Sequence, residues 1–401
     1  MSQVFGLFLY ERQGVSPYCC PMIYLDYCAT TPCHPLVVEA MLPYFTQKFG
    51  NAASRIHPYG WVADEAVQTA RKQVASLIGA GEEEIVFTSG STEGCNLAIK
   101  GVFELYQQAK GKHIITVATE HKAVLDTCKH LGRLGAEITV LGVDEDGLID
   151  LQALEQAIRP DTMLIAIMYA NNETGVIQPI AEIGKLAKQH KALFFCDATQ
   201  AVGKIPINVQ TDGIDLLALS AHKLYGPKGA GALYVRRRDP RVRLMAQIDG
   251  GGHERGIRSG TLNVPGIVGL GKAAALRQES MREEAGQLLV LRKILEDGLL
   301  ENTATGVNGG AAPRLPQVSN VYFENIAAAH LVGKLNSRLA FSVGSACTSG
   351  SQEPSHVLAA MNLSDERIKA SVRLSIGRLT TEAEIKEAQQ LINHAVIELS
   401  K

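Results

Sequence analysis

Residues 193–229 read LFFCDATQAVGKIPINVQTDGIDLLALSAHKLYGPKG. Two short apolar runs, 193–196 and 216–219, are each followed at once by polar residues, DATQ after the first and SAHK after the second. A fully apolar run of this length, bounded by turn residues, is typical of a strand that is buried on both faces. In open parallel sheets, ligands bind beyond the carboxyl ends of the strands. The stretch therefore predicts two buried strands whose ends carry functional side chains.

The same alternation continues on both sides of this stretch. Helical patterns at 122–134, 151–158 and 180–190 separate apolar runs at 84–88, 113–117, 163–168, 193–196, 216–219 and 232–235. Apolar strands joined by amphipathic helices indicate a sheet that is covered by helices on both faces. The predicted fold class is therefore α/β, with a mostly parallel central sheet flanked by helices.

The pattern changes after Pro265. A long amphipathic helix at 273–300 is followed by short strands at 317–323 and 371–375 and by helices near 327–336 and 381–400. This order indicates a smaller α+β domain. We predict a loosely ordered N-terminal extension at 1–22, a large domain at 23–265 and a small C-terminal domain at 266–401. The first residues of the large domain are candidates for packing with the small one.

Composition argues against several classes of protein. The 401 residues include 39 basic and 41 acidic side chains, and a net charge of −2 gives no electrostatic basis for binding nucleic acid. No apolar stretch approaches the ~20 residues that a membrane-spanning helix needs, so no membrane association is expected. The eight cysteines include no C-x-x-C pair and do not form a typical disulfide framework. We expect a cytoplasmic protein without a metal site.

Polar side chains also follow the other predicted strands. SGST follows the run at 84–88, TEH follows 113–117 and NNE follows 163–168. Glycine allows close backbone approach, and hydroxyls with free N–H groups at a helix start favour a phosphate, so Ser91 and Thr92 predict a phosphate site. An ordinary Ser/Thr helix cap is the competing interpretation. The collected acid, base, amide and hydroxyl groups indicate one shared site.

Three residues carry specific chemistry. Lys223 emerges from an apolar strand into a glycine-rich turn, a place suited to a Schiff-base lysine, although most lysines are exposed solubilising groups. Asp197 follows a buried strand and is suited either to capping a turn or to pairing with a pyridinium nitrogen. Cys347 lies in the small, polar stretch SVGSACTSGS at 342–351, which predicts an exposed loop thiol that can act as a nucleophile.

Nine motifs together resemble the group I, NifS/IscS-like cysteine desulfurases, and the match covers the chain from about Ile23 onward. They are YLDY (24–27), TSGSTE (88–93), EHKAV (120–124), NNETG (171–175), DATQAVGK (197–204), SAHKLYGPKG (220–229), GGGHERGIRSGT (250–261), GSACTSG (344–350) and RLSIGR (373–378). Cys28 and the pair Gly94-Cys95 depart from the family's usual residues, and neither change removes a catalytic group.

The resemblance implies a fold-type I, pyridoxal-phosphate-dependent transferase architecture and a homodimer. It implies that Lys223 anchors the cofactor and removes the Cα proton, that His121 stacks on the ring and carries protons, and that Cys347 takes the sulfur of L-cysteine as a persulfide, leaving L-alanine. The remaining implied contacts are to the ring (Asp197, Gln200), to the phosphate (Thr92, Ser220, His222, and Thr261 from the partner subunit) and to the substrate carboxylate (Asn172, Arg373).

Two other classes of function are alternatives to a cysteine desulfurase. A selenocysteine lyase or an aminotransferase of the same fold would share Lys223 and Asp197 but would not need Cys347. A non-enzymatic scaffold would have no reason to keep Lys223, Asp197, His121 and Cys347 together. A sulfur-acceptor protein, such as an iron–sulfur scaffold, is the expected partner, while thiolated tRNA and cofactor sulfuration stay open as destinations.

Overall fold

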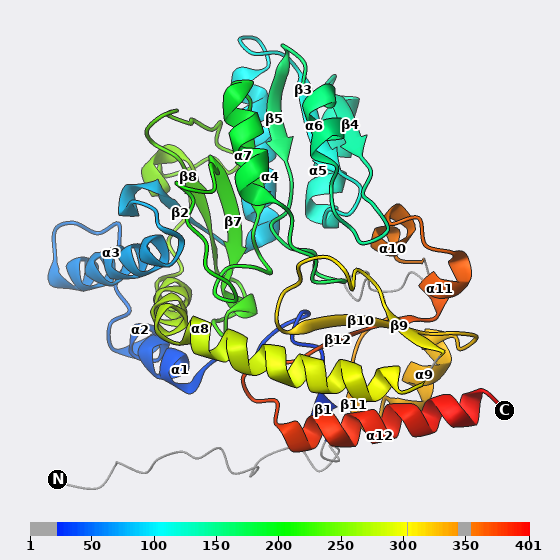
Figure 1. Ribbon diagram of the computed structural model, residues 1–401. Coiled ribbons are helices and arrows are strands. Elements are labelled where there is room, and N and C mark those ends of the chain that lie inside the picture. Colours follow the sequence, from blue (N-terminus) through cyan, green and yellow to red (C-terminus); the bar gives the residue numbers. More distant parts are fainter. Residues whose placement is uncertain (1–21, 303, 344–353) are drawn as a thin grey trace, which may run out of the picture.

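The computed structural model describes residues 22–302, 304–343 and 354–401 (Figure 1). Its largest element is a seven-stranded sheet with the order β2-β8-β7-β6-β5-β3-β4. The strands are β2 (Ile85–Thr88), β3 (His113–Val117), β4 (Glu137–Leu141), β5 (Thr162–Ala166), β6 (Leu193–Asp197), β7 (Leu216–Ser220) and β8 (Gly231–Val235). Pairing is parallel from β7 through β4 and antiparallel on both sides of β8. The predicted α/β class with a mostly parallel sheet is confirmed.

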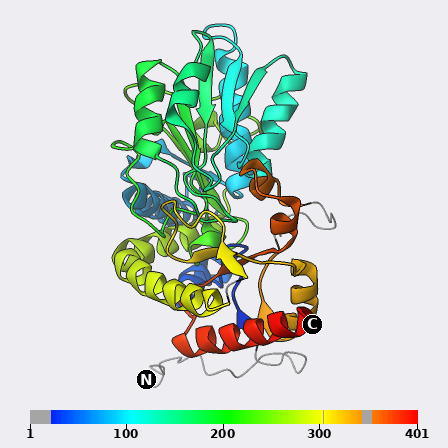
Figure 2. The ribbon, with the colours of Figure 1, turned by 45° about the vertical axis from the view of Figure 1, so that its right-hand side comes forward.

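Helices cover both faces of this sheet, as Figure 2 shows. Successive strand residues point to opposite faces, so Phe194 and Cys196 of β6 join one apolar cluster while Leu193 and Phe195 join another. The second cluster contains α4 (Ser91–Tyr106) and α5 (Lys122–Arg133), and the first contains α3 (Pro58–Ile78), α6 (Leu151–Ala157), α7 (Ile180–Gln189) and the start of α8 (Val264–Leu300). Burial on both sides explains why the central strands are apolar throughout.

A third apolar cluster, the core of the small sheet, lies toward the carboxyl terminus. It gathers around a three-stranded sheet with the order β12-β10-β9, and α12 lies along the lower edge of the molecule in Figure 1. Its elements are β9 (Thr305–Val307), β10 (Val318–Phe323), α9 (Ala328–Leu335), β11 (Leu339–Ala340), β12 (Ser371–Ser375) and α12 (Glu382–Leu399). The short helices α10 (His356–Ala360) and α11 (Asp365–Lys369) instead place Val357, Leu358 and Ile368 in the first cluster of the large sheet. At the other end of the chain, β1 (Ile23–Tyr24) pairs in parallel with β11.

The remaining described elements are short and precede or link the larger ones. They are α1 (Pro35–Met41), α2 (Pro43–Thr46) and the 3₁₀ turns η1 (Glu82–Glu84), η2 (Ala221–Lys223) and η3 (Glu254–Gly256). Within the described ranges, no helix is both long enough and apolar enough to cross a membrane. The predicted extension at 1–22 lies outside the described residues except for Met22, and the three-part division of the chain stays a proposal.

The long helix α8 begins nine residues earlier than the sequence pattern indicated, at Val264 rather than Ala273. Glycines in its first turns hid this start, because glycine is a poor helix former. Close packing explains why glycines occupy these positions. A Cβ at Gly269 would lie 2.6 Å from Met41 Sδ, and one at Gly271 would lie 2.5 Å from Ala70 Cα. The glycines therefore let α8 pack directly on α1 and α3.

Candidate active site

The parallel strands β3, β5, β6 and β7 end at the same edge of the sheet, and the polar segments that follow them meet there. Asn171 Nδ2, after β5, donates to the Thr119 carbonyl oxygen after β3 at 3.0 Å. The amide of Met168 donates to the Glu120 carboxylate. The convergence that the sequence predicted for these segments is therefore present in the fold.

Lys223 lies at the end of η2, directly after β7, and its side chain is buried. Its Nζ donates to the carbonyl oxygens of Cys28 at 2.5 Å and Ala29 at 2.7 Å. The Cys28 carbonyl also accepts from Gln200 Nε2 at 3.0 Å. The main chain after β1 thus holds the amine of Lys223 and the amide of Gln200 at one point inside the protein.

Asp197 is the last residue of β6, the strand next to β7, and it is buried. Its Oδ1 accepts from the Thr199 amide at 3.0 Å, from the Thr199 hydroxyl and from Ser91 Oγ at 3.3 Å. Its Oδ2 accepts from Cys95 Sγ at 3.7 Å. Burial, followed by the charge of Asp197, raises the pKa of the Cys95 thiol well above its ordinary value, so the thiol is a neutral donor.

A candidate phosphate cradle lies where α4 begins, at Ser91 and Thr92. The loop before it runs close to β8, since a Cβ at Gly231 would lie 2.6 Å from Gly90 Cα. A Cβ at Gly90 would in turn lie 3.8 Å from Ser220 Oγ, so the hydroxyl of Ser220 faces the start of the helix. Backbone N–H groups at a helix start, together with hydroxyl donors, suit a phosphate.

His222 lies beside this cradle, and its Nδ1 is 3.1 Å from Thr30 Oγ1. Burial, followed by the charges of Lys223 and Lys228, lowers the pKa of His222 to about 4. A neutral imidazole offers one N–H donor and one acceptor. The donor set of hydroxyls, helix N–H groups, buried carboxylate and buried amine fits pyridoxal phosphate: α4, Ser220 and His222 would hold its phosphate, Asp197 would meet its ring nitrogen, and Lys223 would anchor it.

His121 caps the start of α5, and its Nδ1 accepts from the Ala123 amide at 3.1 Å. Because Nδ1 is an acceptor, the proton of the neutral ring is assigned to Nε2. The preceding Glu120 is completely buried. Burial, followed by the charge of Asp197, raises the pKa of Glu120 well above its ordinary value. The fold therefore favours the protonated form of Glu120 over the ionised one.

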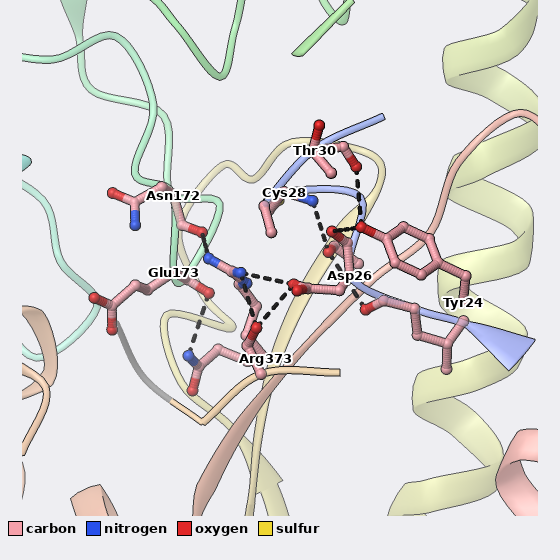
Figure 3. Close-up of polar contacts among 12 residues, drawn as sticks. Tyr24, Asp26, Cys28, Thr30, Asn172, Glu173 and Arg373 are labelled. Carbon is pink, nitrogen blue, oxygen red and sulfur yellow. Dashed lines mark hydrogen bonds and ion pairs between the residues drawn. The ribbon is translucent and has the colours of Figure 1, made fainter. Parts of the chain in front are cut away.

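Arg373 of β12 is buried, and Figure 3 shows its guanidinium pointing toward Asp26 and the main chain of Asn172. Its Nη1 donates to the Asn172 carbonyl oxygen at 2.8 Å, and its Nη2 donates to Asp26 Oδ1 at 2.8 Å and to Ser342 Oγ at 3.1 Å. The side-chain amide of Asn172 points away from Arg373 in the same view (Figure 3).

The described residues on both sides of the segment 344–353 contact this site. Before it, Ser342 contacts Arg373 through both main chain and side chain. After it, Ser355 Oγ donates to the buried carboxylate of Glu173 at 2.5 Å, and His356 Nε2 lies 2.9 Å from the Glu120 carbonyl oxygen. Cys347 itself lies outside the described residues.

Thr261, predicted to act from the partner subunit, is exposed in the segment between η3 and α8.

The sequence analysis gave no role to Asp26, Glu120 or Thr199, although each lies inside a quoted motif. A carboxylate directly after the short apolar run 23–25 was the available signal for Asp26. In the described ranges, no group of three or more His, Cys, Asp or Glu residues is arranged to hold a metal ion.

Comparison with known proteins places this geometry in a family. The aminotransferase class-V family model matches residues 23–387. A cysteine desulfurase IscS from Anaeromyxobacter dehalogenans is 53% identical over 94% of this chain and 93% of its own length. The IscS of Mannheimia succiniciproducens is 54% identical over 94% of this chain and 93% of its own length.

Solved structures agree with the relatives. A NifS-like protein superposes with a TM-score of 0.86 at 35% identity and covers 94% of this chain and 99% of its own. A structure described as SspA in complex with cysteine gives 0.78 at 39% identity, covering 90% and 100%. The chain belongs to the aminotransferase class-V family, whose fold and site are those of a pyridoxal-phosphate enzyme. Within that family it is a group I, NifS/IscS-like cysteine desulfurase.

Proposed function

We propose that this chain removes sulfur from L-cysteine, releases L-alanine and carries the sulfur on Cys347 as a persulfide. The supporting observation is the position of Lys223, a buried amine one strand away from the buried carboxylate of Asp197. The contacts of Ser342 and Ser355 with Arg373 and Glu173 add that both flanks of the Cys347 segment lie at the same site.

Bound pyridoxal phosphate supplies an electron sink for charge that develops at the substrate Cα. Lys223 Nζ removes the Cα proton, and Arg373 orients the substrate carboxylate. The Cys347 thiolate attacks the substrate sulfur, the carbon–sulfur bond breaks, and Cβ takes the electron pair and then a proton. Lys223 Nζ returns a proton to Cα, which completes L-alanine. His121, whose Nδ1 accepts from the Ala123 amide and leaves Nε2 to carry a proton, is the proposed proton carrier.

Two variants separate the halves of this reaction. Lys223→Ala should lose the yellow colour of the bound cofactor and reduce alanine formation by more than about 100-fold, because it removes both the anchor and the base. Cys347→Ser should keep the colour and its change on addition of L-cysteine, but should form no protein persulfide. Alanine, sulfide and persulfide are measured together. Borohydride trapping of the cofactor on another lysine, or normal persulfide formation in Cys347→Ser, would contradict the assignment.

We also propose a homodimer. Apolar side chains of α1, α2, the loop after α2 and the start of α3 are exposed in the single chain, among them Phe45 at 59%, Phe49 at 63% and Trp61 at 55%. The rings of Phe49 and Tyr59 lie 5.3 Å apart, so the loop and the start of α3 expose apolar rings side by side. Apolar patches of this kind mark interaction sites, and we assign this one to a second copy of the chain. The exposed Thr261 is then available to the partner's phosphate site.

The proposed sulfur acceptor is a protein that assembles iron–sulfur clusters, since the relatives that match most of the chain are named IscS. The proposed location is the cytoplasm. The five cysteines within the described ranges are free thiols, which suits a reducing compartment.

A further inference from the structure

The hydrogen bonds of Arg373 leave little of its guanidinium for a substrate. A guanidinium has five N–H donors, one on Nε and two on each of Nη1 and Nη2. Asp26 Oδ1 and Ser342 Oγ take both donors of Nη2, and the Asn172 carbonyl takes one of Nη1. Within the described residues, Nε has no hydrogen-bond partner. The donors left over are thus one on Nε and one on Nη1.

These two donors cannot form a bidentate clamp. A carboxylate binds a guanidinium in a fork through two parallel N–H groups on one edge. Of the two edges that offer such a fork, one pairs Nη2 with Nη1 and the other pairs Nη2 with Nε. Both edges need Nη2, whose donors are already engaged. A substrate carboxylate that binds in a fork must therefore take the place of Asp26 or Ser342.

Asp26 is the natural group to be displaced. It is a carboxylate, like the incoming group, and it contacts Arg373 at 2.8 Å while Arg373 is almost fully buried. Ser342 Oγ also donates to the same Asp26 oxygen at 2.9 Å, which fixes Asp26 in this orientation. A buried arginine without a counter-ion would be strongly destabilising, so Asp26 serves the fold whenever no substrate is bound.

We propose that Asp26 occupies the position of the substrate carboxylate on Arg373 when no substrate is bound. Asp26 orients Arg373 in the empty site and competes with L-cysteine for the Nη2 donors of Arg373. Asp26 is a positioning residue and sets how tightly the enzyme holds amino acids. This inference rests on the proposed role of Arg373 as the substrate's carboxylate clamp.

The test is Asp26→Asn in the cofactor-loaded enzyme. The amide oxygen still accepts from Nη2, but the charge that repels and competes with the substrate is gone. A charge-assisted hydrogen bond is about twice as strong as a neutral one, so we expect the KM for L-cysteine and the Kd for L-alanine to fall on the order of tenfold, with kcat changed less than about threefold. Alanine binding is followed through the cofactor absorbance, which requires no turnover. Binding of cysteamine, which lacks the carboxylate, should stay within about twofold of the wild type.

A matched control is available in the buried pair Asp215–Arg236, whose side chains are 3.0 Å apart at the opposite end of β7. Asp215→Asn should reduce stability without changing the KM for L-cysteine. If Asp26→Asn does not fold, Ser342→Ala opens one edge of Arg373 while leaving the counter-ion, and a smaller decrease in the Kd for L-alanine is expected. Unchanged or weaker alanine binding in the folded variants would overturn the inference. Failure of the wild type to form alanine from cysteine would instead overturn the proposed function.

Discussion

At the scale of single residues, burial acts on the carboxylates of the site. Glu120 follows β3 and Asp197 ends β6, and β5 lies between these two strands. Glu120 is completely buried, and its Oε2 has no hydrogen-bond partner within the described residues. Desolvation, followed by the negative charge of Asp197, penalises the ionised form and raises the pKa of Glu120 well above its ordinary value.

The raised pKa of Glu120 gives a stability prediction for Glu120→Gln. The pKa of Glu120 is raised in the fold, so its contribution to stability is complete below the unfolded pKa of about 4.3 and is lost as the pH rises toward the folded pKa. Glutamine keeps the oxygen that accepts from Met168 and has no proton to lose. We expect the variant to bind the cofactor normally and to gain thermal stability relative to the wild type as the pH is raised from about 5 to 8. A wild-type advantage that grows over this range would show that Glu120 is ionised in the fold.

At the scale of elements, one histidine links three strands. His113 of β3 lies with Nδ1 2.7 Å from Thr162 Oγ1 of β5 and with Nε2 2.8 Å from Thr139 Oγ1 of β4. Burial, followed by the charge of Arg159, lowers the pKa of His113. The neutral ring donates to one threonine and accepts from the other. Its lowered pKa means that the fold favours this neutral form over the protonated one.

Acid should weaken this edge of the sheet. A histidine whose pKa is lowered in the fold contributes fully above its unfolded value of about 6.5 and loses that contribution as the pH falls below it. His113→Gln should be less stable than the wild type at pH 7.5 and should lose less additional stability on acidification to pH 5.5. Urea unfolding at the two pH values measures this. The exposed His330 provides the control, and His330→Gln should follow the wild-type curve.

At the scale of the whole molecule, the exposed apolar surface of α1, α2 and α3 predicts a variant that separates the subunits. Placing a charge in a dimer interface costs desolvation on both partners. Phe45→Asp combined with Phe49→Asp should shift the protein from twice the chain mass to the chain mass in light scattering. Activity should fall with it, because Thr261 then no longer reaches the partner's site. Leu134→Asp, at a 60% exposed position elsewhere, is the control. A monomeric wild type would refute the proposed dimer.

The sequence alone was sufficient for the fold class, and it marked the strand ends at which the candidate site lies. The central strands are buried on both faces, so they appear as continuous apolar runs, and each run ends at the polar residues that form the site. The edge strand β4 was missed because none of its residues is fully buried and its sequence leaves no continuous apolar run. The start of α8 was missed because its glycines oppose helix formation locally while tertiary packing requires them.

What the sequence determined by itself was chemical identity: which strands are apolar, which lysine follows a buried strand, and which motifs occur in which order. What the tertiary structure decided was pairing between distant segments. Arg373 meets Asp26 across 347 positions of the chain, and Lys223 meets the Cys28 carbonyl across 195. Local periodicity carries no information about such contacts. They form only when the residues from Ile23 to Cys28 pack into both the small-sheet core and the large-sheet core. The hydrogen-bond partners of Arg373, on which the proposed role of Asp26 rests, are therefore visible only in the folded chain.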